Sequence, residues 1–195
     1  NGWDNLSSFS NARYHFATAV VGTKIYIIGG IDSGGNRIDN VDSYEIGTDS
    51  WSTSPTDLSV GRTYHTAQVY NSKIYIFGGR PSGHTGHNWP KTVLEFDPSS
   101  GTNGTWTDKG EIMPLTSTYA GDMQINTIAV SNKIYIVHYR GQGMYEWDIE
   151  NDSWTNMVRL NPCSGTGNTS GLNGYFPLAA DASYIYAFGG QVQQN

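Results

Sequence analysis

The amino-acid sequence predicts an all-β fold made of repeated four-stranded sheets. Three observations support this prediction: a short strand that recurs with a glycine pair, a fixed order of small and aromatic residues around it, and a composition poor in helix formers. Glycine is abundant, and only 14% of the 195 residues are charged. Such a composition is typical of short strands joined by turns, because helices draw on Ala, Leu, Glu and Lys.

The recurring strand is the clearest repeat in the chain. It reads KIYIIGG at Lys24–Gly30 and KIYIFGG at Lys73–Gly79, with weaker copies KIYIVHY at Lys133–Tyr139 and YIYAFGG at Tyr184–Gly190. The last residues of the four copies are spaced by 49, 60 and 51 residues. Spacing of this order indicates stacked structural units. The glycine pair permits positive φ or a close backbone approach where the strand ends.

Each unit reads as four strands whose side chains suit a radial arrangement. A strand of small residues precedes the recurring strand, with Ala17, Ala19, Ala67, Ala129, Ala179 and Ala180. Two more strands follow it, in which Tyr44 leads to Trp51, Phe96 to Trp106, and Trp147 to Trp154. A lone four-stranded sheet cannot bury its apolar faces. Sheets stacked around an axis would place small residues at the crowded centre and large rings at the rim, which is the arrangement of a β-propeller.

The repeats also give the domain organisation. We expect an outermost strand of a preceding blade at 1–10, blades at 11–57, 58–112 and 117–158, and inner strands of a further blade at 173–195. About three full blades plus parts of others favour a segment of a larger propeller over a ring completed by separate chains. A closed four-blade ring is disfavoured, because the last blade would lack a strand. Open blade edges would also permit self-assembly.

The repeated pattern resembles that of kelch repeats. The first copy shows it as Arg13, His15, Gly29-Gly30, Tyr44 and Trp51. The second copy shows it as Arg62, His65, Gly78-Gly79, Phe96 and Trp106. The third copy departs from the pattern, with His138-Tyr139 in place of the glycine pair. The resemblance implies a kelch-type β-propeller whose inter-strand loops and blade-to-blade loops line one binding face.

These loops supply the candidate ligand-binding residues. The candidates are Arg13, His15, Arg37, Arg62, His65, His84, His87, Trp89, Tyr119 and Arg140. Arg and aromatic side chains on rigidly supported loops suit a carboxylate, a hydroxyl-rich glycan or an acidic peptide. Alternatively, the Arg and His that recur in successive units fasten neighbouring blades through backbone carbonyls. Arg37, Trp89 and Arg140 do not recur and are therefore better candidates for selective contact.

We therefore expect a non-catalytic binding or assembly module that engages protein or glycan, with no cofactor and no metal. HTGHNW holds His84 and His87, but two histidines without further ligands do not indicate a metal site. The kelch resemblance leaves one alternative, because kelch propellers include copper galactose oxidases and a sialic-acid mutarotase. Cys163 alone does not locate the Tyr–Cys crosslink of such an oxidase. A mutarotase needs an acid/base pair and an Arg, which the histidines and arginines of the repeated pattern could supply.

Charge and glycosylation sequons bear on partners and compartment. A formal net charge of −6 without a basic cluster predicts no nucleic-acid partner. No apolar run approaches the roughly 20 residues of a membrane span. Asn-x-Ser/Thr sequons at Asn5, Asn103, Asn151 and Asn168 are candidates for glycosylation. Together with the low lysine content they favour a secreted or cell-surface protein, with a cytoplasmic adaptor as the alternative.

Overall fold

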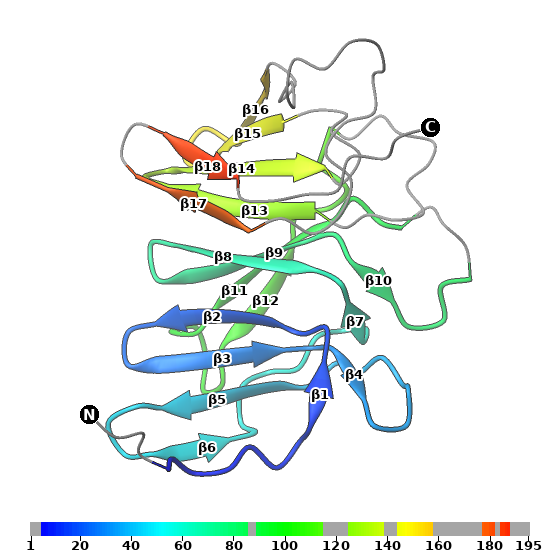
Figure 1. Cartoon of the computed structure of the whole chain (residues 1–195), viewed down its shortest axis with the longest axis vertical. Helices are drawn as coiled ribbons and strands as arrows, with labels where there is room; N and C mark the ends of the chain where they lie inside the picture. The colour runs from blue at the N-terminus through cyan, green and yellow to red at the C-terminus, as the bar shows by residue number, and fades with distance from the viewer. Residues whose placement is uncertain are drawn as a thin grey trace.

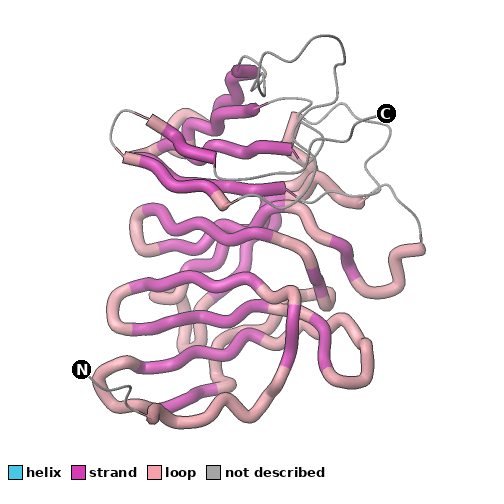
Figure 2. The backbone as a smooth tube through the Cα atoms, viewed as in Figure 1, coloured by secondary structure: helices cyan, strands magenta, loops and turns pink. Residues whose placement is uncertain are grey.

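The computed structural model describes residues 5–85, 89–114, 125–138, 144–157, 177–181 and 184–187. Within these ranges every regular element is a β-strand (Figure 2), as the composition predicts. The described residues form three antiparallel four-stranded sheets, a two-stranded sheet and two short ribbons. The sheets are stacked along the long axis of the molecule (Figure 1). In this part of the chain no helix is long and apolar enough to cross a membrane.

Each four-stranded sheet is a simple up-and-down blade. The first blade has β2 (Ala17–Val21), β3 (Lys24–Ile28), β5 (Val41–Glu45) and β6 (Ser50–Ser52). The second has β8 (Thr66–Tyr70), β9 (Lys73–Phe77), β11 (Val93–Asp97) and β12 (Thr105–Asp108). The third has β13 (Ile125–Val130), β14 (Lys133–His138), β15 (Met144–Asp148) and β16 (Ser153–Met157). The two-stranded sheet pairs β17 (Leu178–Ala180) with β18 (Ile185–Ala187).

Two short ribbons extend from the ends of the blades. One pairs β1 (Arg13–Tyr14) with β4 (Ile31–Asp32), and the other pairs β7 (Arg62–Thr63) with β10 (Arg80–Pro81). Both ribbons lie on the same side of the molecule (Figure 1). In each ribbon one strand follows a glycine pair and the other precedes the first strand of a blade. We refer to the side of the molecule with the two ribbons and their loops as the loop face.

The radial distribution of side chains agrees with the propeller prediction. The small-residue strands β2, β8, β13 and β17 are neighbours along the molecule (Figure 1), as innermost strands should be. On the outermost strands the three tryptophans pair in register with the aromatic of the preceding strand, as Tyr44 with Trp51, Phe96 with Trp106, and Trp147 with Trp154. The ring centroids of these pairs are 5.0, 4.8 and 5.8 Å apart. Large rings therefore fill the outer part of each wedge.

The hydrophobic core lies between blades. Tyr26 and Ile28 of the first blade pack against Ile74, Ile76 and Phe96 of the second. A second cluster, which includes Phe77, Val93, Ile134, Ile136 and Trp147, joins the second and third blades in the same way. Each sheet thus buries one face against its neighbour, which a lone four-stranded sheet could not do.

Hydrogen bonds tie the blades together at the centre and at the rim. At the centre, Gln68 on β8 donates from Nε2 to the carbonyl of Thr127 at 2.9 Å, and its Oε1 accepts the Ala129 amide at 3.0 Å. At the rim, Trp106 Nε1 donates to the carbonyl of Thr56 at 2.8 Å. Thr56 lies in the linker that leaves the first blade, so this bond fastens the first blade to the second.

The N-terminal segment makes the equivalent hydrogen bond at the rim of the first blade. Trp51 Nε1 donates to the carbonyl of Ser7 at 2.9 Å, and the Ser7 amide donates to Asp49 at 2.7 Å. Ser7 therefore stands to Trp51 as Thr56 stands to Trp106. Residues 5–10 contain no strand, in contrast to the outermost strand expected for residues 1–10, and residues 1–4 lie outside the described residues.

Candidate functional site

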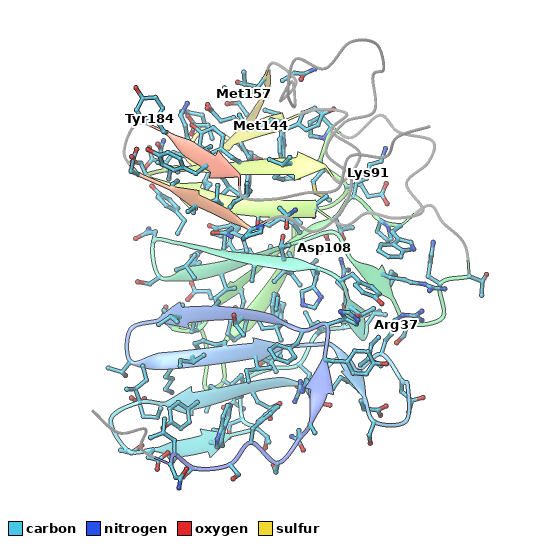
Figure 3. All side chains as sticks on the ribbon, in the orientation of Figure 1. Arg37, Lys91, Asp108, Met144, Met157 and Tyr184 are labelled. Atoms are coloured by element: carbon cyan, nitrogen blue, oxygen red, sulfur yellow. The ribbon has the colours of Figure 1, made fainter. Side chains whose placement is uncertain are left out.

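Loops of the first and second blades are joined into one surface beside the two ribbons. The Arg62 amide donates to the carbonyl of Ile38 at 3.1 Å, and the Ser82 amide donates to Gly61 at 2.7 Å. Ser82 Oγ also donates to the carbonyl of Arg37 at 2.8 Å. The loop after β3 and the loop after β9 are thereby held side by side. Figure 3 shows Arg37 on this side of the molecule.

The two recurring arginines are held by the ends of the recurring strands. Arg62 is only 7% exposed, and its Nη1 donates to the carbonyl of Gly78 at 2.6 Å and to Thr92 Oγ1 at 2.8 Å. Arg13 donates to the carbonyl of Gly29 at 3.2 Å and forms an ion pair with Asp42. Burial lowers the pKa of both arginines from its usual value. These contacts favour the architectural role over the ligand-binding role.

The two histidines of the repeated pattern occupy different positions, so their pairing in the sequence comparison is wrong. Ala17 pairs with Ile28 and Thr66 pairs with Phe77, so Ala17 and Thr66 open equivalent strands. Counting back one residue, His65 stands where the first blade has Phe16. His15 is instead equivalent to Tyr64, and both adopt positive φ, of 55° and 59°.

His65 is part of the joint between blades. Its side chain is 4% exposed, and Nε2 lies 3.1 Å from the carbonyl oxygen of Ile28 in the first blade. Burial, and next the nearby charge of Arg62, lower the pKa of His65 to about 3. The imidazole is therefore neutral at physiological pH and donates Nε2–H to Ile28. The neutral His65 side chain therefore links the second blade to the first through this hydrogen bond.

Replacing His65 with Phe, the residue at the same position in the first blade, is expected to reduce the acid sensitivity of the fold. In the unfolded chain a histidine has a pKa of roughly 6.5, whereas folded His65 stays neutral down to about pH 3. Between these values the unfolded state binds more protons, so the histidine destabilises the fold progressively as the pH falls from 6.5 toward 3. Urea midpoints at pH 7 and pH 4.5 should fall further for the wild type than for His65→Phe. Equal falls would contradict this account.

Arg37, Arg80, His15, Tyr64 and Trp89 gather on the joined loops, and we refer to them as the arginine–aromatic cluster. The rings of His15 and Tyr64 have centroids 4.3 Å apart. Tyr64 and Trp89 are stacked with centroids 5.8 Å apart and an interplanar angle of 15°. Arg80 Cζ lies 6.0 Å from the Trp89 ring centroid, at the limit of a cation–π contact. Trp89 is buried at the base of the cluster, whereas His15 is exposed.

The two arginines of the cluster carry positive charge that no acid neutralises within the described residues. The ion pairs found there involve Arg13 and lysines, and none involves Arg37 or Arg80. Arg37 Nε is buried without a hydrogen-bond partner, and so is Arg80 Nε. Burial, and next the charge of Arg80, lower the pKa of Arg37. Neighbouring like charges without a counter-charge favour the approach of an anion.

Comparison with known proteins agrees with the architecture. Residues 6–190 match the family model described as the KLHDC2/KLHL20/DRC7 Kelch-repeats domain. The chain belongs to the kelch-repeat family. This confirms the resemblance found in the repeated pattern and, with the observed strands, the prediction of a kelch-type β-propeller.

Relatives of the kelch chain are longer than the chain itself. It is 25% identical over 181 residues to an F-box/kelch-repeat protein of Arabidopsis thaliana, covering 88% of this chain and 42% of the relative. It is 26% identical over 180 residues to Kelch-like protein 15 of Homo sapiens, covering 82% of this chain and 28% of the relative. The chain thus spans less than half the length of these relatives. The solved structure of YjhT has the same fold, with a TM-score of 0.66, 20% identity, and coverage of 89% of this chain and 58% of that one.

The remaining candidates of the kelch chain are dispersed. His84 is half-buried, and its carbonyl accepts a 3.4 Å bond from Arg80 Nη2. Asn5, Asn103 and Asn151 are exposed, and Asn103 and Asn151 lie in turns before the outermost strands. His87, Tyr119, Arg140, Cys163 and Asn168 lie outside the described residues. Among the residues that the structure describes, no three His, Cys, Asp or Glu side chains are grouped to hold a metal ion.

Sequence reasoning did not select Arg80. One signal was present: Arg80 follows the second glycine pair directly, where the first unit has the apolar Ile31. A charged residue at a position that is apolar in another repeat is a departure from the architectural pattern. Its nearness to Arg37 depends on tertiary contacts and is not visible in the sequence.

Proposed function

We propose that this kelch chain is a non-catalytic binding module that engages a protein partner through the loop face around the arginine–aromatic cluster. The observation that carries the proposal is that loops of two different blades, bonded to each other from Ser82 Oγ to the carbonyl of Arg37, bring Arg37 and Arg80 together. Neither arginine has an acidic partner in the described part of the chain. Arginine and aromatic side chains are the groups that most often dominate the binding energy of protein interfaces. An acidic segment of a partner would find both here.

The geometry gives less support to the enzymatic alternative. A sugar mutarotase would need an acid/base pair, and His65 is buried, neutral and bonded to the carbonyl of Ile28. Arg13 and Arg62, the arginines that would hold a substrate carboxylate, bond to backbone carbonyls of their own blades. Withdrawing Arg62 from the carbonyl of Gly78 would break a buried hydrogen bond and leave its acceptor without this partner, which costs about 1–3 kcal/mol.

Display of a random peptide library tests the proposal. We expect the wild-type chain to enrich peptides with acidic residues, and the double variant Arg37→Ala/Arg80→Ala to bind the enriched peptides at least about tenfold more weakly, since each charge-assisted bond contributes about 1.5–3 kcal/mol. Lys24→Ala is the control, because it removes a positive charge from the opposite end of β3.

Two outcomes would overturn the proposal. One is the absence of any enriched peptide together with binding on a glycan array, which would make the loop face a carbohydrate site. The other is enrichment of peptides whose affinity falls equally in Lys24→Ala and in the double variant, since binding would then depend on overall charge and not on the cluster.

A further inference from the structure

We propose that the arginine–aromatic cluster recognises a phosphorylated tyrosine side chain, with the phosphate bound between Arg37 and Arg80 and the phenyl ring against Tyr64 and His15. This inference rests on the proposed function, because it names the group of the partner protein that the cluster would bind. It is carried by two independent features: the charge of the arginine pair and the row of rings beside it.

The charge of the pair matches a dianion better than a single carboxylate. Two guanidinium groups carry two positive charges, and one carboxylate neutralises only one of them. A phosphate monoester carries a charge of about −1.5 to −2 at pH 7 and presents three acceptor oxygens. Each guanidinium offers paired donors that fit two phosphate oxygens. One phosphate would therefore offset the repulsion between Arg37 and Arg80.

Acidic residues near these arginines along the chain do not pair with them. Asp39, two residues after Arg37, is exposed and takes part in none of the ion pairs found among the described residues. The Asp32 carboxylate accepts bonds from the Gly34 amide at 2.9 Å and the Asn36 amide at 2.8 Å, within its own turn. Asp42 is paired with Arg13. None of these three acids forms an ion pair with Arg37 or Arg80, so the charge of the two arginines is available to a ligand.

The rings beside the arginines point to an aromatic ligand group. The side chains form a continuous row: the ring of His15 contacts that of Tyr64, Tyr64 stacks on Trp89, and Arg80 lies over the Trp89 ring. A ligand whose phosphate lies at Arg80 would bring its own ring alongside Tyr64. Aromatic pairs contribute about 0.5–1.5 kcal/mol beyond the area they bury. A phosphorylated serine or threonine offers no such ring.

Hydrogen bonds hold the backbone segments of two of these rings, His15 and Tyr64, next to each other. His15 and Tyr64 occupy equivalent positions of the two units, and both have positive φ values, which are uncommon for residues other than glycine. The Tyr64 amide donates to the carbonyl of His15 at 3.3 Å, and Thr63 Oγ1 donates to the same carbonyl at 3.2 Å. The linker between the blades and the segment before the first blade are thus fixed together with their rings adjacent.

Fluorescence anisotropy with labelled peptides tests the proposal on the whole chain. Five peptides share the same neutral flanks and differ at one residue: phosphotyrosine, sulfotyrosine, tyrosine, phosphoserine or glutamate. We expect phosphotyrosine to bind at least about tenfold tighter than tyrosine or glutamate, from the added charge-assisted bonds. It should bind at least about threefold tighter than phosphoserine, from ring stacking. Sulfotyrosine has the same shape and one charge fewer, so it should bind more weakly than phosphotyrosine.

Variants assign the effect to the cluster. Arg37→Gln and Arg80→Gln should each remove most of the preference for phosphotyrosine over tyrosine, while Lys24→Gln should leave it unchanged. His15→Ala changes an exposed side chain, so it leaves the core intact. It should reduce the preference for phosphotyrosine over phosphoserine without changing the preference for phosphotyrosine over tyrosine, because both tyrosine peptides lose the same ring contact.

Several outcomes would overturn the inference. Equal affinity for phosphotyrosine and glutamate peptides would leave the proposed protein-binding function intact and remove phosphate recognition. Equal affinity for phosphotyrosine and sulfotyrosine would contradict the charge argument, and equal affinity for phosphotyrosine and phosphoserine would contradict the ring argument. Absence of binding by all five peptides, when library peptides do bind the loop face, would also overturn it.

Discussion

Replacing Phe96 with alanine is expected to lower the free energy of unfolding by about 3–5 kcal/mol, the range typical of a large buried ring. Phe96 is completely buried on β11, in the core between the first and second blades. Its ring lies 5.8 Å from Tyr26 of the first blade and 4.8 Å from Trp106 at the rim. Gly104 passes so close to it that a Cβ there would lie 2.3 Å from the ring. A cavity at this position removes packing between the two blades, at Tyr26, and at the rim, at Trp106.

Urea unfolding followed by tryptophan fluorescence measures this effect. The control is Val20→Ala, because Val20 is also on a blade but is 55% exposed. Its free energy of unfolding should change by no more than about 0.5 kcal/mol. If both variants lost the same stability, the interface between the blades would not be the main core of the molecule.

Replacing Gly29 with alanine is expected to cost about 2–5 kcal/mol of stability, from backbone strain together with steric overlap. Gly29 has φ 59°, and a Cβ there would lie 2.5 Å from the carbonyl oxygen of Arg62 and 2.9 Å from the ring of His65. Both atoms belong to the second blade or its linker. The added methyl group would therefore push the second blade away from the first at the point where the Gly30 amide donates to Arg62 at 2.8 Å.

Gly22 provides a matched control for Gly29. It has the same φ of 59°, but a Cβ there would meet nothing within 4 Å. Gly22→Ala should therefore show only the cost of the left-handed backbone, about 1–2 kcal/mol. The difference between the two variants measures the close approach of the blades. Equal losses in urea titrations would mean that φ alone requires glycine at the end of the recurring strand.

The fold was predictable because the residue types in each unit show which strand lies at the centre of the blade and which lies at its rim. Alanines mark the inner strand, the Ile-Tyr-Ile segment marks the next strand, and tryptophans such as Trp51 and Trp106 mark the rim. These features depend on local strand pairing and on the taper between sheets. Both follow from side-chain size, and both recur in order, so a single sequence is sufficient to find them.

The site was only partly predictable, because it depends on contacts between units. Arg37 was expected from the sequence, but Arg80 becomes its neighbour only through the bonds that join Ile38, Arg62 and Ser82. The histidine comparison failed for a related reason. It matched residue types, whereas the ladders of β2 with β3 and of β8 with β9 define which positions are equivalent.

The attachment of the first blade to the second has a consequence for how a ligand meets this face. Arg37 and Arg80 project from different blades, yet bonds from Gly30 to Arg62, from His65 to Ile28 and from Trp106 to Thr56 bridge those blades from the loop face to the rim. Widening the gap between the two guanidinium groups would require breaking several of these bonds together. The proposed binding face is therefore preorganised. We expect association to need little ordering of its loops, and an anion of the wrong size to bind weakly because the loops do not adapt to it.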